Sequence, residues 1–274
     1  MDRARLPRRI RLSASGTVAE LRQDELTEAG VMLTIDGVEQ SHVETDDPGW
    51  LLHDYTLRIA AVLDALAGWS AERPWSVLHL GAGALTLPRW VEHRAGQRRL
   101  PPPEQTVLDF EPELMDFVLE HLPMRTRPRT VVADAAAALA DGGELEGERH
   151  DAVVVDLFNG AHAPDQLTSA TFCAHVARTV DDDGVLVMNL GDDPGLHFAR
   201  PLIRRILHAA AGADPSRLLV TAPADVLAGA TAGNLVVAAL GEPVPTRAAE
   251  AVWAAGPHPG DVLTGDELRQ WLGL

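Results

Sequence analysis

Between residues 76 and 190 the chain alternates five short apolar runs with segments of helical character. Strands that alternate with helices in this way form a parallel sheet with helices on both faces, because each crossover must pack back onto the sheet. We therefore predict a doubly wound α/β sheet. Its five predicted strands are Ser76–Leu80, Thr106–Phe110, Thr130–Val132, Ala152–Asp156 and Val185–Leu190.

Two further strands, Arg217–Thr221 and Asn234–Leu240, are predicted after the alternating region. The roughly dozen residues between them are too few for a parallel crossover with a full helix, so antiparallel pairing is predicted. These strands bring the predicted sheet to seven. Thr264 and Glu267 have the spacing of a capping box, which predicts a short helix at the C-terminal end.

An antiparallel β unit is predicted ahead of this sheet. Its strand-like segments are Thr17–Gln23, Val31–Ile35 and Val38–Val43. Asp36-Gly37 is a strong two-residue hairpin signal, because both positions of such a turn need positive φ. A helix is predicted over residues 51–66 from its apolar spacing. We therefore divide the chain into a β unit, residues 1–50, and an α/β domain, residues 51–274.

The charge and composition of the chain exclude several functions. The chain has 40 acidic and 23 basic residues and a net charge of −17, so nucleic acid and anionic membrane surfaces are disfavoured partners. Every basic residue is arginine, which excludes lysine-dependent Schiff-base chemistry. Cys173 is the only cysteine and the histidines lack ligand spacing, so no metal is expected. Because neither a signal peptide nor a membrane-length apolar run is recognised, we expect a cytoplasmic protein.

A glycine-bearing turn follows the first strand of the predicted sheet. It contains Gly81, Ala82 and Gly83, and a helix is predicted from near Leu85. Glycines allow a ligand to approach the backbone closely, and the start of a helix offers free N–H groups. The third glycine of the dinucleotide fingerprint would fall at position 86, which is Thr86. A nicotinamide or flavin pyrophosphate site is therefore disfavoured.

Acidic residues stand at the ends of the next three strands: Asp109, Asp134 and Asp156. Ligands of open α/β sheets bind at the carboxyl ends of the strands, so we predict that these acids and the glycine turn line one cleft. Asp109 has the position of an acid that accepts hydrogen bonds from ribose hydroxyls. Asp134 is expected either to contact an adenine amino group or to cap the following helix. Glu111 is expected either to contact the ligand or to be a first-turn helix acid that the helix dipole stabilises.

Together these segments resemble the class I S-adenosylmethionine-dependent methyltransferase fold and, within it, the spermidine synthase (polyamine aminopropyltransferase) family, as a divergent member. The resemblance covers nearly the whole chain. It implies a seven-stranded Rossmann-like sheet with a small N-terminal β-hairpin domain, a homodimer and a role in polyamine biosynthesis. The matching motifs are Leu33–Ser41 with the family's L-x-x-D-G-x-x-Q, residues 109–112 with its E-I-D-P, residues 133–135 with its G-D-A, and Asp156 with its catalytic aspartate.

The resemblance also implies a role for each matching position. The ligand would be S-adenosylmethionine or its decarboxylated form, methylthioadenosine would be the product, and the partner would be a small-molecule amine. Asp156 would orient and deprotonate the attacking amine. The implied nucleoside contacts are Gly81, Ala82 and Gly83 beneath the thioether, Asp109 at the ribose, Asp134 with Ala135 at the adenine, and Gln40 over the ligand, with Glu111 as a further cofactor-binding residue.

Two departures from the family pattern concern the acceptor. The second acid of the family's D-x-x-D-P loop is replaced by Asn159, which would bind a diamine ammonium more weakly. The family's Y-H-E segment is absent, and Tyr55 stands nearby as a candidate substrate contact or a packing residue. Three functions therefore stay open: transfer of an aminopropyl or related group to an amine, transfer of a methyl group, and non-catalytic binding of S-adenosylmethionine or a nucleoside.

Overall fold

The computed structural model describes residues 6–157 and 164–274, which form two compact units. Unit 1 comprises the chain up to residue 53 together with residues 70–75 and 81–134. Unit 2 comprises residues 54–69, 76–80 and 135–274. The two units are defined by which residues contact one another most densely. The predicted boundary after residue 50 was defined differently, by the end of the N-terminal β unit.

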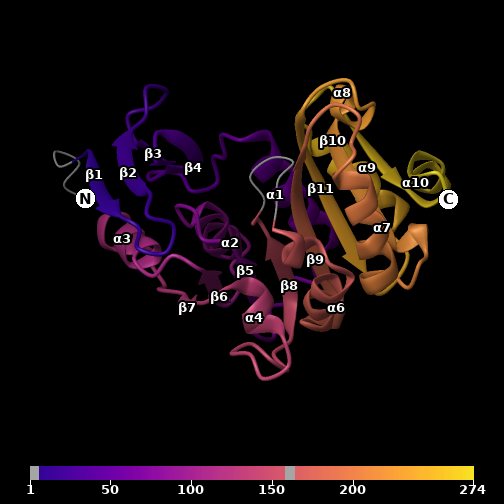
Figure 1. The fold of residues 1–274 in the computed structure, drawn as a ribbon, viewed down its shortest axis with the longest axis horizontal. Coiled ribbons are helices and arrows are strands. Elements are labelled where there is room, and N and C mark those ends of the chain that lie inside the picture. The colour runs from indigo at the N-terminus through magenta and orange to yellow at the C-terminus, as the bar shows by residue number, and fades with distance from the viewer. Residues whose placement is uncertain (1–5, 158–163) are drawn as a thin grey trace. The chain divides into compact units, whose positions relative to one another are not determined.

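Unit 1 opens with a four-stranded antiparallel sheet in the order β1-β2-β3-β4 (Figure 1). The Asp36-Gly37 turn is confirmed, with φ of 48° and 81° at its two positions. The first strand was not predicted, because its sequence Arg-Arg-Ile-Arg offers one apolar side chain to a core. The strands are β1 (Arg8–Arg11), β2 (Val18–Gln23), β3 (Gly30–Ile35) and β4 (Val38–Glu44).

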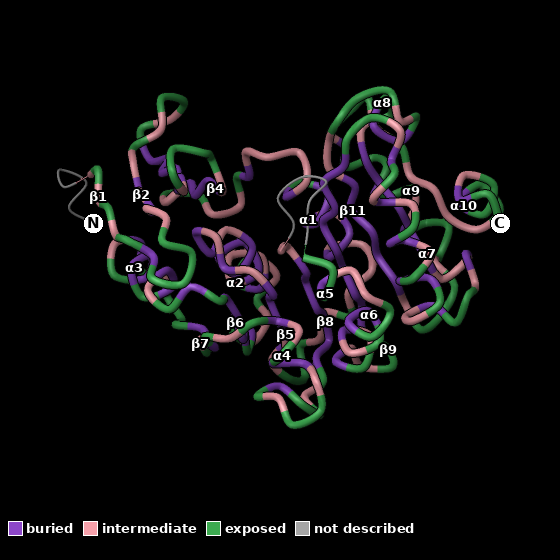
Figure 2. The backbone as a smooth tube through the Cα atoms, in the orientation of Figure 1, coloured by how far each residue is buried: buried purple, intermediate pink, exposed green. Residues whose placement is uncertain are grey.

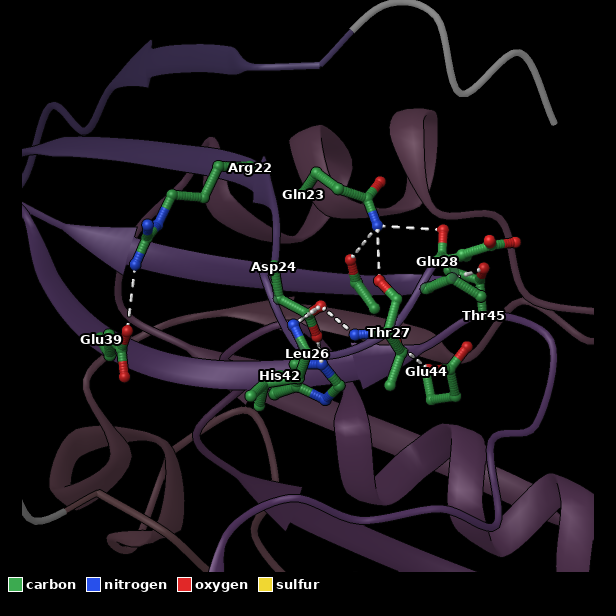
Figure 3. A network of polar contacts seen from close by, with 12 residues as sticks. Arg22, Gln23, Asp24, Leu26, Thr27, Glu28, Glu39, His42, Glu44 and Thr45 are labelled. Atoms are coloured by element: carbon green, nitrogen blue, oxygen red, sulfur yellow. Dashed lines mark hydrogen bonds and ion pairs between the residues drawn. The ribbon is translucent and has the colours of Figure 1, made fainter.

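A buried polar network ties the loop after β2 to strand β4 (Figure 3). Asp24 accepts hydrogen bonds from the backbone N–H of Leu26 and of Thr27, each at 2.9 Å, and its other oxygen pairs with His42 Nε2. Burial acts to raise the pKa of Asp24, but the hydrogen bonds from Thr27, His42 and Leu26 outweigh it, and the pKa lies below its ordinary value. This network fixes the loop against β4.

The main sheet has eight strands in the order β12-β10-β11-β9-β8-β5-β6-β7. Parallel pairing is confirmed for β5 with β8, β8 with β9 and β6 with β7, and antiparallel pairing for β10 with β11. The α/β fold class is therefore confirmed. The strands are β5 (Ser76–Leu80), β6 (Glu104–Asp109), β7 (Arg129–Val132), β8 (His150–Val155), β9 (Val180–Asp192), β10 (Leu218–Pro223), β11 (Gly233–Leu240) and β12 (Gly260–Thr264).

Seven strands were predicted for the main sheet, and β12 is the eighth, which the sequence did not predict. It pairs antiparallel with β10 at the edge of the sheet. Its five residues, Gly-Asp-Val-Leu-Thr, are all partly buried or exposed, so they lack the continuous apolar run that marks the central strands.

The helices predicted over residues 51–66 and from near Leu85 are confirmed as α1 and α2, whereas α8 and α9 were not predicted. Helix α7 begins at Ala199, where the Asp192 carboxylate accepts the backbone N–H groups of Phe198 and Ala199. No described helix has both the length and the apolar character needed to span a bilayer. The helices are α1 (Asp54–Leu66), α2 (Thr86–Gln97), α3 (Leu114–His121), α4 (Ala135–Leu139), α5 (Asp165–Thr168), α6 (Ala170–Arg178), α7 (Ala199–Ala210), the 3-10 turn η2 (Pro215–Arg217), α8 (Ala224–Leu227), α9 (Thr246–Ala255) and α10 (Gly265–Leu272).

The predicted C-terminal helix is confirmed as α10, but its capping box is wrong. Thr264 occupies the N-cap position with extended backbone angles, yet its side chain makes no capping hydrogen bond. Leu268 and Leu272 are fully buried, so α10 is held by packing of its apolar face.

Each unit has its own apolar core. In unit 2 every residue of β8 is buried, and β9 is buried continuously from Gly184 to Asp192, as Figure 2 shows in purple. In unit 1 the core lies between the N-terminal sheet and helix α3 and includes Leu21, Leu33, Met115 and Val118.

A buried arginine joins helix α1, strand β10 and the loop before β12 in unit 2. Arg58 of α1 is 3% exposed, and its guanidinium donates to both oxygens of Asp54, at 2.6 and 3.2 Å. The same group donates to Thr221 Oγ1 on β10 at 3.0 Å and to the carbonyl of Pro257 at 2.9 Å. Because Asp54 is its one acidic partner among these contacts, the charge balance of this position depends on that carboxylate.

Candidate active site

Several backbone amides in and directly after the glycine turn of unit 1 donate to protein groups. The N–H of Ala82 donates to Asp109 Oδ2 at 3.0 Å, and that of Ala84 donates to Ser41 Oγ at 2.7 Å. The N–H of Leu85 donates within the turn, to the carbonyl of Ala82 at 2.8 Å. A phosphate cradle needs such amides to be free for the anion. The amides of Ala82, Ala84 and Leu85 are therefore not available to an anion, and the predicted lack of a pyrophosphate site stays a prediction.

Gly83 is required by both the conformation and the crowding of this turn. Its φ is +48°, and a Cβ at this position would lie 2.8 Å from Ser41 Oγ. Ser41 is buried and holds the Ala84 amide, so it cannot move away without losing that hydrogen bond.

We expect Gly83→Ala to destabilise unit 1 by about 1–3 kcal/mol, because strain and lost hydrogen bonding add. The matched control is Gly96→Ala in α2, where a Cβ meets nothing within 4 Å. There the same change should stabilise the protein by about 0.5–1 kcal/mol, because alanine favours the helix. Thermal unfolding of both variants measures the contrast, and equal effects at the two positions would contradict the assigned role of Gly83.

Asp109 lies at the end of β6, and both its carboxylate oxygens are used. Oδ1 accepts the N–H of Glu111 at 2.9 Å and Oδ2 accepts that of Ala82, and the residue is 8% exposed. Burial raises the pKa of Asp109 above its ordinary value, while the backbone hydrogen bonds from Glu111 and Ala82 act to lower it. The backbone N–H of Phe110 also hydrogen-bonds with this carboxylate. A carboxylate accepts about four hydrogen bonds, so Asp109 keeps capacity for one more, to a ligand hydroxyl.

Glu111 has a clear structural task. Its carboxylate accepts the backbone N–H of Ala14 at 3.2 Å and of Ser15 at 3.0 Å, and the residue is 2% exposed. It therefore fixes the loop between β1 and β2 to the segment ahead of α3. Its predicted contact with a nucleoside stays a prediction.

Exposed apolar side chains lie next to Asp109, and the sequence reasoning missed them. Phe110 is 54% exposed and Val132 is 47% exposed, and Val132 pairs directly with Asp109 across β6 and β7. Asp134, two residues beyond Val132, is also exposed. A large apolar residue directly after the strand-end acid was the signal available in the sequence. This end of unit 1 thus offers apolar surface beside carboxylates, which suits a flat base with polar edges.

Gln40 is the extra residue of a β-bulge. Leu33 pairs with Ser41 and Thr34 with Glu39, which leaves Gln40 without a partner across the hairpin. Bulges re-aim side chains and are frequent next to active sites. The Gln40 amide donates to the carbonyl of Val38 at 3.5 Å, a long contact.

Unit 2 holds the predicted catalytic acid. Asp156 directly follows β8, and its N–H donates to the carbonyl of Leu80 at 2.8 Å. Its Oδ1 accepts a hydrogen bond from Asn189 Nδ2 at 2.9 Å, and its carboxylate also hydrogen-bonds with Tyr55. Burial raises the pKa of Asp156, while these two hydrogen bonds act to lower it. Burial, followed by the charge of Asp156, raises the pKa of Tyr55 well above its ordinary value, so Tyr55 stays the proton donor of the pair.

Asn189 was not predicted as a site residue. The available signal was one amide side chain inside the apolar run Val185–Leu190. The predicted substrate contact Tyr55 lies at Asp156, whereas Asn159 falls outside the described residues. Among the residues that are described, no group of three or more His, Cys, Asp or Glu is placed to hold a metal ion.

The predicted site residues divide between the two units. The cleft that was predicted to include all of them stays a prediction. Unit 1 holds Gln40, the glycine turn, Asp109, Glu111 and Asp134, and unit 2 holds Tyr55, Asp156 and the buried Ala135 at the start of α4.

The curated proteins similar to this chain support the resemblance to polyamine aminopropyltransferases. One such protein from Ruegeria is 26% identical over 165 residues, or 59% of this chain and 53% of the relative. Another, from Neisseria meningitidis serogroup A, is 27% identical over 158 residues, or 55% of this chain and 53% of the relative. The chain thus matches about half the length of these relatives. No family model matches it.

Solved structures confirm the fold. A probable spermidine synthase from Corynebacterium glutamicum has a TM-score of 0.81 at 24% identity, covering 98% of this chain and 94% of its own. Human methyltransferase-like protein 13 in complex with SAH has a TM-score of 0.54 at 16% identity, covering 81% of this chain and 94% of its own. Both comparisons agree with the predicted class I methyltransferase fold.

Proposed function

We propose that this chain is a spermidine synthase-like transferase that moves an aminopropyl or related group from decarboxylated S-adenosylmethionine, or from S-adenosylmethionine, to an amine. The observation that carries the proposal is the Asp156 carboxylate, held by Tyr55 and Asn189 at the end of a central strand. The similarity to transferases supports the class of reaction. Fold alone does not assign function, so the argument rests on this acid.

We assign to unit 1 the binding of the nucleoside part of the donor. Phe110 and Val132 supply apolar surface for the adenine, and Asp134 supplies an acceptor for its amino group. Asp109 keeps acceptor capacity for a ribose hydroxyl. Because the amides of Ala82 and Ala84 already donate to protein groups, the assigned ligand is one without a pyrophosphate.

Asp156 is assigned the proton transfer. The sulfonium of the donor supplies the chemistry, since the bond between its sulfur and the transferred carbon breaks and methylthioadenosine leaves with the electron pair. The carboxylate of Asp156 orients the amine nitrogen that bonds to this carbon and accepts the proton that the nitrogen loses. Positioning and general base catalysis of this kind supply the rate.

Replacing Asp109 by alanine should weaken nucleoside binding about tenfold or more, because the hydrogen bonding to the ribose and the anchor of the Ala82 amide are lost together. Calorimetry with methylthioadenosine measures the change. Glu113→Ala is the matched control, since Glu113 is an acid of the same segment that accepts the exposed N–H of Ser13 at 3.1 Å. An unchanged affinity in Asp109→Ala would contradict the ribose assignment.

The reaction product tests the proposed function directly. The full chain is incubated with decarboxylated or ordinary S-adenosylmethionine and a panel of amines, and the products are read by mass spectrometry. Methylthioadenosine together with an alkylated amine is the expected result. Retained nucleoside binding without either product would overturn the transferase assignment and favour a non-catalytic binding protein.

Methyl transfer is the second candidate. The observation that favours it is the fold similarity to a human methyltransferase-like protein solved with SAH. The same incubation separates the two reactions, because methyl transfer releases S-adenosylhomocysteine instead of methylthioadenosine.

The proposed setting is the cytoplasm, with a small-molecule amine as partner and a homodimer as the assembly. The acidic net charge of −17 supports a cationic or neutral substrate. Light scattering of the purified full chain tests the dimer, for which we expect twice the mass of one chain.

A further inference from the structure

Asn189 is a polar side chain in the buried part of strand β9 of unit 2. Strand β9 is buried without interruption from Gly184 to Asp192, and Asn189 itself is 3% exposed. It stands directly after Met188, which pairs with Val155 in the parallel register of β8 and β9. The register therefore places Asn189 beside Asp156, the residue that follows Val155.

The nitrogen and the oxygen of the Asn189 side-chain amide differ in their hydrogen bonding. Nδ2 donates to Asp156 Oδ1 at 2.9 Å. Oδ1 is buried and, among the residues that the structure describes, has no hydrogen-bond partner. Nearly all buried polar atoms in folded proteins are paired, because an unpaired one loses its hydration without compensation. Asn189 Oδ1, an unpaired carbonyl oxygen beside a carboxylate, is thus an acceptor to which a bound molecule can donate a hydrogen bond.

The two neighbouring acceptors, the Asp156 carboxylate and Asn189 Oδ1, match the two N–H donors of an attacking primary amine. A neutral primary amine has two N–H bonds and one lone pair. One N–H can donate to the Asp156 carboxylate and the other to Asn189 Oδ1. The nitrogen lone pair then takes part in no hydrogen bond and is free to attack the carbon that is transferred. Tyr55 donates to the carboxylate and so leaves its other acceptor positions for the amine.

We propose that Asn189 is a positioning residue for the transfer, holding the Asp156 carboxylate through Nδ2 and orienting a primary amine through Oδ1. This proposal rests on the proposed transferase function. It predicts that primary amines are used, and that secondary amines, which have a single N–H, are poor acceptors.

The first test does not require turnover. The infrared absorption of the protonated Asp156 carboxyl, identified by its loss in Asp156→Asn, is followed against pH. In Asn189→Leu we expect its apparent pKa to rise by about one unit, because the carboxylate loses a hydrogen-bond donor. Asn234→Leu, the same change on the adjacent strand β11, is the matched control and should leave the pKa unchanged. An unshifted pKa in Asn189→Leu would overturn the proposal.

The second test uses the amine reaction. With a primary amine, Asn189→Leu should lower kcat/KM about 100-fold, with unchanged KM for the nucleoside donor and with the acidic limb of the pH profile moved upward. Asn189→Gln keeps the amide and should recover part of the rate. A rate loss with an unmoved pH profile and no recovery would reduce Asn189 to a packing residue and overturn the proposal.

The two tests separate failure of this proposal from failure of the proposed function. If the parent protein forms no alkylated amine, the transferase assignment fails. The infrared titration still decides whether Asn189 lowers the pKa of the Asp156 carboxyl. Asn189→Asp serves if the leucine variant does not fold, because it keeps the size of the side chain. It removes the donor and adds a second carboxyl, so the carboxyl pKa should rise further than in Asn189→Leu.

Discussion

Replacing Asp156 by asparagine should lower kcat about 1,000-fold and leave the affinity for methylthioadenosine unchanged. The amide has the shape of the carboxylate but cannot accept the proton that the amine loses. It can still bond to Asn189 or Tyr55, so the local structure should persist. Steady-state kinetics and calorimetry on the same preparation measure the two effects.

The pH profile of the parent protein gives an independent check on this acid. Asp156 must be ionised to act as a base, and burial raises its pKa. The rate should therefore rise with pH and should do so at a higher pH than for an exposed aspartate, whose pKa is about 3.9. Asp266→Asn, at a fully exposed position of α10, is the control and should leave the profile unchanged. Unaltered turnover in Asp156→Asn would remove Asp156 from the catalytic role.

Asp54→Ala should be the most destabilising of the single changes considered for unit 2. It leaves the guanidinium of Arg58, which is 3% exposed, without its acidic partner. Removing one member of a buried ion pair costs about 3–5 kcal/mol, and the 41% exposure of Asp54 places this case at the lower end. About 3 kcal/mol corresponds to a fall in Tm of roughly 6–12 °C for a chain of this size.

The exposed pair of Arg127 and Asp116 is the matched control for this prediction. Its side chains are 61% and 76% exposed, so Asp116→Ala should cost less than about 1 kcal/mol. Calorimetric unfolding of both variants gives the comparison. Similar losses in the two variants would mean that the Arg58 charge is stabilised by Thr221 and Pro257 alone.

The parts of the fold that depend on local pattern were predictable. The central strands are continuous apolar runs, and the Asp36-Gly37 turn needs residues that tolerate positive φ, so both were visible in the sequence. Strands β1 and β12 were not, because their stability comes from pairing with a neighbour and not from their own composition.

The site was predictable at its strand ends and not in its contacts. The positions of Asp109 and Asp156 follow from the alternation of strands and helices. The bond between Asp156 and Asn189 depends on the register of β8 against β9, which one sequence does not fix. The apolar surface of Phe110 depends on exposure, which likewise follows from packing.

The way each unit is assembled from separate stretches of chain has a consequence for synthesis on the ribosome. Helix α1 is made early, but the unit to which it belongs continues to residue 274. Its Arg58 bonds to Thr221, 163 residues later. Contacts so distant in sequence form slowly and leave surfaces uncovered until the later segment emerges. A nascent chain stopped before β10 should therefore carry α1 with a hydrated guanidinium, and protease protection of this helix should begin only after β10 has left the exit tunnel.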